Sequence, residues 1–142
     1  MKNMWPQSFK ENSNPAPKEI LETQARLLAK LTNNRVFAEV VEESISKVSI
    51  FEGITGEFCF RLDIVGQYIA GGYRFRVLTF CHDISLYPVK FRLDSELGRE
   101  LKGKDVAEVT IETPEALEVL LESVLKSDRV QNVVGAILKL SK

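Results

Sequence analysis

The sequence predicts an α+β domain: an antiparallel, four- to five-stranded meander sheet with an N-terminal helix and two C-terminal helices. Three observations lead to this prediction. A stripe of apolar side chains at helical spacing follows Pro17. Segments between residues 35 and 93 alternate apolar and polar side chains and are joined by short connections. Two helix-start signals, at 113–115 and 127–128, precede apolar stripes near the end of the chain.

The N-terminal part divides into a tail and a helix. Residues 1–16 are polar and rich in Pro and Asn, so we expect a flexible tail before a single domain over residues 17–142. Proline suits the first turn of a helix, which places the helix start near Pro17. The face that this helix must bury carries Ile20, Leu21, Gln24, Leu27, Leu28 and Leu31, and residues 32–34 form a polar stop.

The middle of the chain has the pattern of β-strands. We expect strands over residues 35–42, 57–65, 73–81 and 85–93, with the glycine-containing stretch GQYIAGG as a turn between the second and third. The loop of residues 43–56 carries apolar side chains and is compatible with a further short strand. Because the connections are short, the strands should form an antiparallel meander.

The C-terminal part turns helical again. Residues 94–101 predict one or two helical turns, and residues 104–112 a further strand. Thr113 can cap a helix that has proline at its first position and an acidic residue at its second. Ser127 and Asp128 can begin a last helix, whose buried face would comprise Val130, Val133, Val134, Ile137 and Leu138.

Composition limits the classes of function. A chain of 142 residues with 44% hydrophobic residues can bury a core without metals or disulfides. Its net charge of −1 argues against a protein coated in positive charge for nucleic acid. No apolar run approaches the length of a membrane span, and the N-terminal residues lack the apolar core of a secretory signal. We therefore expect a cytoplasmic protein with no membrane contact.

The two cysteines and the single histidine do not predict a metal site. Cys59 and Cys81 are well separated, and neither belongs to a Cys-x-x-Cys pair. In a reducing compartment such cysteines are typically packed thiols. The alternation of the strands puts them on different faces of the sheet, which argues against pairing. The sequence thus predicts no metal and no cofactor.

The triplet Cys81-His82-Asp83 contains the only residues that resemble a catalytic centre. Neighbouring residues of an extended strand point to opposite faces, so Cys81 and His82 should point apart. A nucleophile and its base need hydrogen-bond contact, which this arrangement does not provide. We interpret His82 as a residue at a strand end and keep it as a weak catalytic candidate. With a carboxylate from elsewhere, it could serve a hydrolase or nuclease.

A repeated pattern of aromatic and basic residues is more informative. The segments CFRLD, YRFRV and VKFRL place Arg61, Arg74, Arg76, Lys90 and Arg92 on one sheet face, opposite the phenylalanines. Strict alternation adds Leu78, Phe80 and Leu86 to the far end of this face, which predicts a half-basic, half-apolar surface. An even hairpin register would put Arg76 opposite Lys90 and Arg74 opposite Arg92. Either nearby carboxylates compensate these charges or an anionic partner binds them, and the third helix or a partner covers the apolar part.

Several segments resemble an uncharacterised family of short bacterial α+β proteins. They are LLAKLTNNRV, YRFRV, HDISLYPVKF and SDRVQNVVGAIL, and the resemblance extends over most of residues 17–140. It implies the α+β fold and a bacterial source, and no activity, cofactor or catalytic residue. The segment 43–56 is longer than the resemblance would lead us to expect.

Three functional hypotheses follow. The first is a small cytosolic, non-catalytic protein whose half-basic, half-apolar sheet face binds a partner protein or a second copy. An immunity or antitoxin-like protein, or an accessory subunit, would behave in this way. The second is a hydrolase or nuclease that uses His82 with a carboxylate. The third is weak, nonspecific nucleic-acid binding through the basic residues, which would be strongly salt-dependent. The sequence favours the first, because no nucleophile–base pair, phosphate loop or metal-ligand set is visible.

Overall fold

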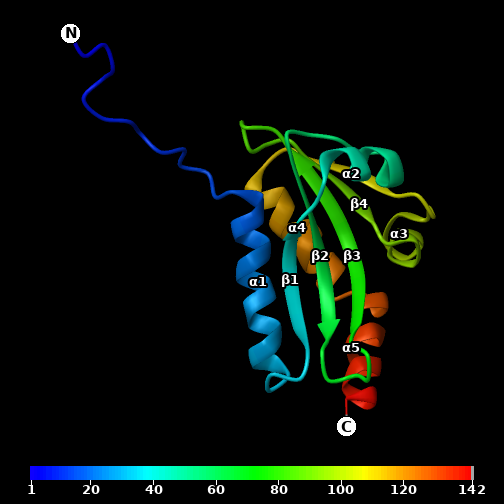
Figure 1. The fold of residues 1–142 in the computed structure, drawn as a ribbon. Helices are drawn as coiled ribbons and strands as arrows, with labels where there is room; N and C mark the ends of the chain where they lie inside the picture. Colours follow the sequence, from blue (N-terminus) through cyan, green and yellow to red (C-terminus); the bar gives the residue numbers. More distant parts are fainter. Residues whose placement is uncertain (142) are drawn as a thin grey trace.

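Five antiparallel strands form one sheet in chain order, β1-β2-β3-β4-β5 (Figure 1). The structure is a computed structural model and describes residues 1–141. The strands are β1 (Phe37–Glu42), β2 (Phe58–Gly66), β3 (Tyr73–His82), β4 (Val89–Leu93) and β5 (Glu108–Ile111). This arrangement confirms the predicted antiparallel meander, with its N-terminal helix and two C-terminal helices.

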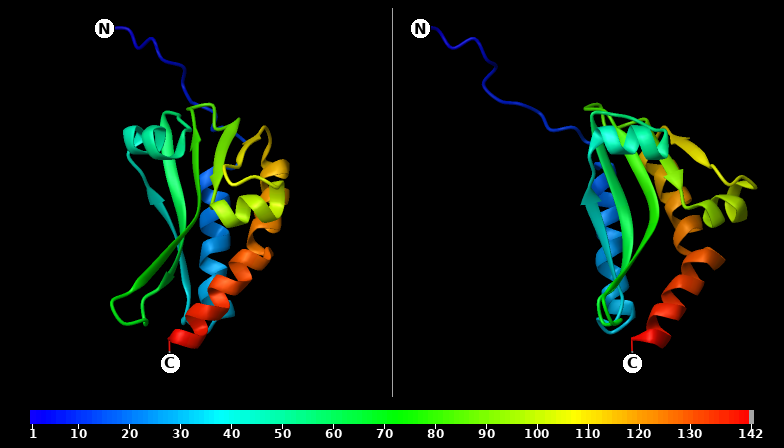
Figure 2. Two further views of the ribbon diagram at one scale, coloured as in Figure 1. Left: turned by 90° about the vertical axis from the view of Figure 1, so that its right-hand side faces the viewer. Right: turned by 45° about the vertical axis from the view of Figure 1, so that its right-hand side comes forward.

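The helices are α1 (Pro17–Leu31), α2 (Ile45–Glu52), α3 (Ser95–Lys102), α4 (Pro114–Leu125) and α5 (Asp128–Leu140). Figure 2 shows α1, α4 and α5 on one side of the sheet, whereas α2 lies at the other side near one end. We call the side covered by α1, α4 and α5 the helical face, and the opposite side the arginine face. The expectation that the third helix could cover the apolar part of the opposite face is wrong, because all three predicted helices lie on the helical face.

Local signals in the sequence explain where the helices begin. Thr113 Oγ1 accepts a hydrogen bond from Ala116 N, and Ser127 Oγ accepts one from Val130 N, so both predicted caps are confirmed. Proline occupies the first turn of α1 and of α4. Asp94 caps α3, whose position confirms the helical turns expected after β4.

The main core lies between the helical face of the sheet and α1, α4 and α5. Phe60, Phe80 and Phe91 stack side by side across β2, β3 and β4, with ring centroids 5.2 and 5.6 Å apart. Leu21 of α1 and Leu117 of α4 are fully buried against them. The aromatic side of the sheet is thus the side that the helices cover, as the alternation predicted.

An irregularity in β3 overturns part of the predicted face assignment. Leu62 pairs with Leu78, but Asp63 pairs with Arg76, so Val77 is an extra residue opposite β2. Such a bulge reverses the alternation on one side of it. Leu78 and Phe80 consequently point into the core with Phe75, and their placement on the arginine face was wrong.

The register of β3 and β4 also differs from the prediction. Thr79 lies opposite Arg92 and Cys81 opposite Lys90, so no like-charged pair faces another across this ladder. β4 begins only at Val89, so the connection after β3 is longer than the one predicted between residues 81 and 85. Arg74 and Arg76 lie beyond the part of β3 that pairs with β4.

A second, smaller core covers one end of the arginine face. Residues 45–52 form helix α2 instead of a short strand, and Val48 and Ile54 bury the two cysteines against the sheet. Cys59 and Cys81 are cross-strand partners on the same face, so the prediction that they lie on different faces is wrong. The bulge at Val77 is again the reason. Both are free, buried thiols, as expected.

Candidate functional site

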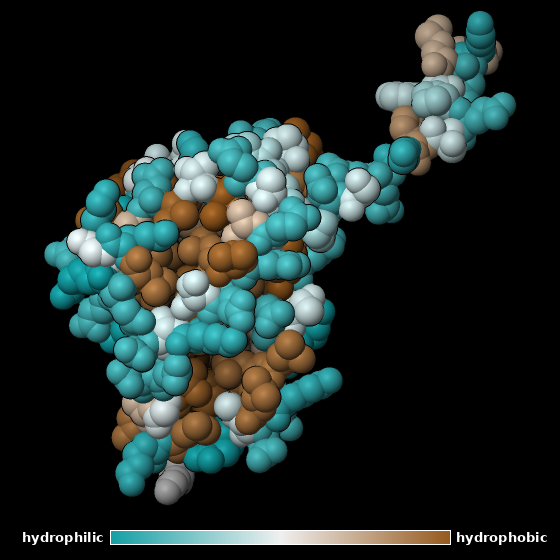
Figure 3. Space-filling view, turned by 180° about the vertical axis from the view of Figure 1, so that it is seen from behind, coloured by the Kyte–Doolittle hydropathy of each residue, from teal (hydrophilic) through white to brown (hydrophobic). Residues whose placement is uncertain are grey.

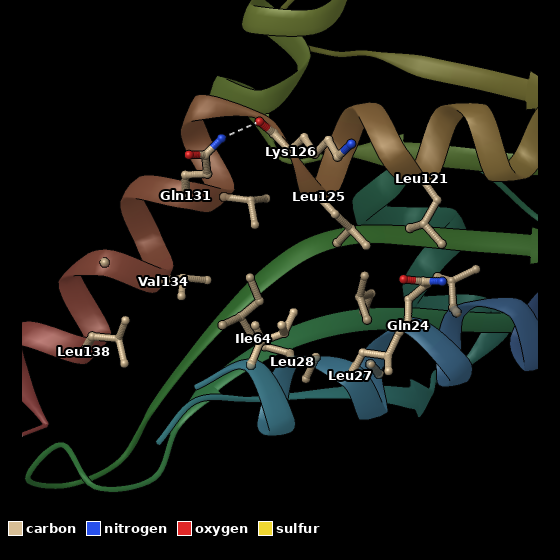
Figure 4. A pocket seen from close by; sticks show the side chains of 17 residues that line it. Gln24, Leu27, Leu28, Ile64, Leu121, Leu125, Lys126, Gln131, Val134 and Leu138 are labelled. Carbon is tan, nitrogen blue, oxygen red and sulfur yellow. Dashed lines mark hydrogen bonds between the residues drawn. The ribbon is translucent and has the colours of Figure 1, made fainter. Parts of the chain in front are cut away.

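An apolar groove opens on the helical face between α1 and the α4–α5 pair (Figure 4). It arises because α1 packs along the edge strand β1, whereas α4 and α5 pack over the other strands. Ala38, Leu62 and Ile64 of the sheet lie at its floor. The groove has a volume of about 490 Å³, within the range of binding sites for small ligands and peptide side chains.

The two walls of the groove are aliphatic. Leu27 and Leu28 of α1 face Leu125 of α4 and Val134 of α5 across the opening (Figure 4). Leu27 is 42% exposed, so a large apolar side chain remains open to solvent here. Figure 3 shows apolar side chains gathered in a hollow on this side of the molecule. Contiguous exposed apolar surface of this kind is typical of interaction sites.

Polar groups occur at the rim of the groove rather than inside it. Gln24, Lys126 and Gln131 are all exposed, and Gln131 Nε2 donates a hydrogen bond of 2.6 Å to Lys126 O (Figure 4). At the lower end, Arg35 Nη2 donates a hydrogen bond of 2.6 Å to Leu138 O. This bond ties the C-terminal turn of α5 to the segment that follows α1, and a cation there also matches the negative end of the helix dipole.

The groove continues upward between α1 and α4. A second hollow of about 610 Å³ shares Gln24, Leu121 and Leu125 with the first and extends to Pro15, where the N-terminal tail begins. Its α4 side carries Glu118 and Glu122. Glu122 pairs with Lys126 at 2.7 Å, and this cation lowers the pKa of the Glu122 carboxyl. The upper end of the groove is therefore acidic on one side.

The arginine face contains the basic residues predicted to bind a partner, but its charges are largely paired within the chain. Arg61 pairs with Glu43 and Asp63, Arg74 with Glu39 and Asp63, and Arg76 with Glu52. Arg92 Nη1 donates a hydrogen bond of 2.6 Å to Glu52 O. Compensation by nearby carboxylates, one of the two alternatives left open by the sequence, is thus what the structure contains.

Asp63 is the centre of this network. Its side chain is almost completely buried, and Oδ2 accepts hydrogen bonds from Arg61 Nε at 2.8 Å and Arg74 Nη1 at 3.0 Å. The hydrogen bond and charge of Glu39, together with Asp63, raise the pKa of Arg74, so this guanidinium stays charged. The network connects β1, β2 and β3 on the arginine face of the sheet.

The other predicted binding residues are scattered. Lys90 is exposed on the arginine face, beside the small core that covers Cys81. Leu86 lies in the β3–β4 connection with a positive φ of 76° and is only partly exposed. Leu78 and Phe80 are in the main core. The predicted half-apolar part of this surface therefore does not form, and Leu78 and Phe80 pack on the opposite side.

His82 is buried on the helical face at the end of β3. It stacks against Phe58 and Phe60, with ring centroids 5.4 and 6.1 Å away, and Nδ1 lies 2.7 Å from Asp83 O. Asp83 Oδ1 accepts a hydrogen bond from Glu57 N instead of turning toward the histidine. Cys81 points to the other face, where burial and the neighbouring Cys59 thiol raise its pKa. These three side chains do not converge.

Among residues 1–141, His, Cys, Asp and Glu side chains form no group of three that could hold a metal ion. None of the helices in the described part of the chain combines the length and the apolar character that a bilayer span requires.

Comparison with models of protein families, with curated proteins and with solved structures finds no match to this chain. The resemblance to a family of short bacterial proteins, drawn from packing and turn segments, stays a prediction.

Sequence reasoning missed the groove because it treated every apolar helix position as buried. The stripe of α1 includes Leu27 and Leu31, which are 42% and 81% exposed. One signal was present in the sequence: α1 carries apolar side chains at 20, 21, 27, 28 and 31, a wider stripe than one edge strand can cover. Whether helices leave a gap depends on their spacing, which periodicity does not report.

Proposed function

We propose that this protein is a non-catalytic binding protein that takes an apolar segment of a partner protein into the groove between α1 and α4–α5. The observation that carries the proposal is the groove itself, an aliphatic hollow with exposed Leu27 and Leu31 on its α1 side. Helix-in-groove and peptide-in-groove recognition both use such a surface, with large apolar side chains as anchors.

The polar surroundings of the groove suggest the chemistry of the partner. The interior of the groove is aliphatic and cannot pair with a charged ligand, because the polar residues Gln24, Lys126 and Gln131 lie at the rim. Its upper end is flanked by Glu118 and Glu122. The segment that fits best has two or three large apolar side chains followed by a lysine or arginine, since the basic group would meet the acidic rim.

The arginine face is a weaker candidate for the partner-binding surface. Three of its arginines are held by four carboxylates of the same chain, so a partner there would have to break existing ion pairs. Apolar side chains that enter the groove break no ion pair, and Glu118 at its upper end forms none within residues 1–141. This difference is why we place partner binding on the helical face.

A peptide-display library panned against the immobilised full chain tests the proposal. We expect enriched peptides that carry two or three large apolar side chains and a basic residue. Affinities of the enriched peptides are then measured by fluorescence anisotropy with two groove variants. Leu27→Glu places a charge on the exposed wall, and Gly135→Phe fills the opening, since a Cβ at Gly135 meets nothing within 4 Å. Both should weaken binding at least about tenfold.

The matched control is Lys90→Glu, which changes an exposed residue of the arginine face. It should leave the affinity unchanged, and circular dichroism should show that all variants fold. Peptides that bind both groove variants as well as the unaltered chain would refute the proposed site. Peptides weakened only by Lys90→Glu would return the binding surface to the arginine face.

A further inference from the structure

The N-terminal tail carries the same kind of segment that the groove fits. Met4, Trp5 and Phe9 are 86%, 73% and 72% exposed, although they are among the largest apolar side chains of the chain. The rings of Trp5 and Phe9 lie 5.9 Å apart, so they already form a small apolar cluster outside the domain. Lys10 follows immediately. The extended tail leaves this cluster without a packing surface (Figure 1).

The tail leaves the domain at the upper end of the groove. Pro15 is itself one of the residues that line the groove there. Tyr87 Oη donates a hydrogen bond of 3.0 Å to Pro15 O, which fixes the point where the tail begins. Burial and the nearby Glu115 and Glu118 carboxylates raise the pKa of Tyr87 to about 12, so the phenol stays protonated and able to donate.

The linker is long enough for the tail to fold back. Six peptide units connect Phe9 to Pro15 and reach up to about 20 Å when extended. The α1 wall of the groove, from Ile20 to Leu31, is roughly 16 Å long. Asn14 N donates to Asn12 Oδ1 at 2.9 Å, and the chain bends locally at this point of the linker.

The charges of the tail and of the upper groove also favour docking of the tail in the groove. Residues 1–16 contain Lys2 and Lys10 against one acid, Glu11. The α4 side of the upper groove carries Glu118 and Glu122, and within residues 1–141 Glu118 forms no ion pair. With Phe9 in the groove, Lys10 would lie between the apolar opening and these carboxylates. The tail therefore has the apolar anchors followed by a base that the proposed function requires of a partner.

We propose that Met4–Lys10 docks into the groove of its own chain, so that a partner must displace it. This inference rests on the same groove as the proposed function and names its first occupant. The tail conformation of Figure 1 is then the open state. A segment tethered through six residues has a high effective concentration at the groove, which favours the same chain over a second copy.

Trp5 is the only tryptophan of the chain, so its fluorescence reports directly on docking. In the full chain we expect emission at shorter wavelength, and weaker quenching by acrylamide, than in a synthetic peptide of residues 1–16. Leu27→Glu and Gly135→Phe should return both signals to those of the peptide, whereas the control Lys90→Glu should not change them. The shift should be independent of protein concentration, since docking occurs within one chain.

Two results would overturn the inference. One is a Trp5 spectrum in the full chain that equals that of the peptide. The other is a blue shift that grows with protein concentration, which would assign the tail to the groove of a second copy.

Competition separates this inference from the proposed function. A peptide enriched on the groove should restore solvent exposure of Trp5, and removal of residues 1–16 should tighten its affinity about tenfold if the tail is docked in ~90% of molecules. Enriched peptides that bind the groove of a chain whose Trp5 is always exposed would leave the proposed function standing and refute the docked tail. A docked Trp5 with no enriched peptides would do the reverse.

Discussion

The helical face and the arginine face of the sheet differ in how their side chains are satisfied. On the helical face, Phe60, Phe80 and Phe91 are covered by three helices, except where α1 separates from α4 and α5 and leaves the groove. On the arginine face, carboxylates from β1, β2, α2 and the β1–α2 connection pair with arginines of β2 and β3. The apolar side chains of the helical face are buried by helices except at the groove. The arginines of the other face are instead paired with carboxylates of the same chain.

This difference indicates where a partner can bind at the lowest cost. An ion pair that already exists must be broken before an outside ligand can use its arginine, and the desolvated carboxylate is then left behind. Exposed aliphatic surface has no ion pair to break, so a ligand in the groove displaces only water or the weakly held apolar side chains of the tail. The groove is thus the more available surface, even though the arginine face has the more conspicuous residues.

The largest expected effect tests whether Phe80 belongs to the helical face. Phe80 is fully buried and stacks on Phe60 and Phe91. Phe80→Ala should lower the free energy of unfolding by about 3–5 kcal/mol, since it removes a core ring and leaves a cavity. Urea unfolding followed by circular dichroism measures the change.

Lys90→Ala is the control on the other face and should change the same quantity by no more than about 0.5 kcal/mol, because the side chain is exposed. A Phe80→Ala variant as stable as Lys90→Ala would mean that Phe80 lies outside the core, as strict alternation had predicted.

The next effect tests whether charge closes the arginine face. Asp63→Asn removes the negative charge that two guanidinium groups share at 2.8 and 3.0 Å. We expect a loss of about 1–3 kcal/mol in unfolding free energy, less than for an isolated buried pair, because Arg61 and Arg74 keep Glu43 and Glu39. Chemical denaturation of the variant gives the value.

Glu39→Gln serves as its matched control. The Glu39 side chain is 47% exposed, so its ion pair with Arg74 should contribute less than about 1 kcal/mol. Equal losses for Asp63→Asn and Glu39→Gln would show that burial of Asp63 adds nothing to the network.

The same two faces show what the sequence could and could not predict. Cap residues such as Thr113 and Ser127, and the alternation along β2, act locally, so the helix starts and the meander followed from them. The bulge at Val77 has no local signature, and it put residues 78–82 on the face opposite to the predicted one. One inserted residue therefore explains why the predicted faces of Phe80, Cys81 and His82 were all wrong.

The candidate site was out of reach for a different reason. The stripe of α1 was correctly predicted to be amphipathic, but its Leu27 and Leu31 meet no facing helix. Periodicity reports which side of a helix is apolar and not how far away the neighbouring helix packs. Spacing between helices is set by tertiary contacts, which no short window of sequence contains.

A smaller effect tests the link between the tail and the upper groove. Tyr87→Phe removes the hydrogen bond to Pro15 O and should lower the unfolding free energy by about 0.5–1.5 kcal/mol. The folded phenol has a pKa raised from 10.0 to about 12, so its contribution is complete below pH 10. It should be lost as the pH rises through about 12.

Unfolding free energies of the unaltered chain and of Tyr87→Phe, measured from pH 9 upward, check this prediction. The difference between them should shrink as the phenol of the unaltered chain ionises. Equal stability of the two chains at pH 9 would indicate that the ring of Tyr87, which both chains keep, and not its hydroxyl matters at this position.

The smallest effect compares a helix glycine beside the groove with a helix glycine in a closely packed position. A Cβ at Gly135 of α5 meets nothing within 4 Å, whereas one at Gly98 of α3 would lie 2.7 Å from Lys104 O and 2.9 Å from Ala107 Cβ. Alanine is the better helix former, so Gly135→Ala should raise the unfolding free energy by about 0.5–1 kcal/mol. Gly98→Ala should lower it despite the same gain in helix propensity, because backbone and a buried methyl group must move apart. Thermal unfolding of the two variants gives the signs, and a loss at Gly135 would mean that the opening beside α5 is already filled in solution.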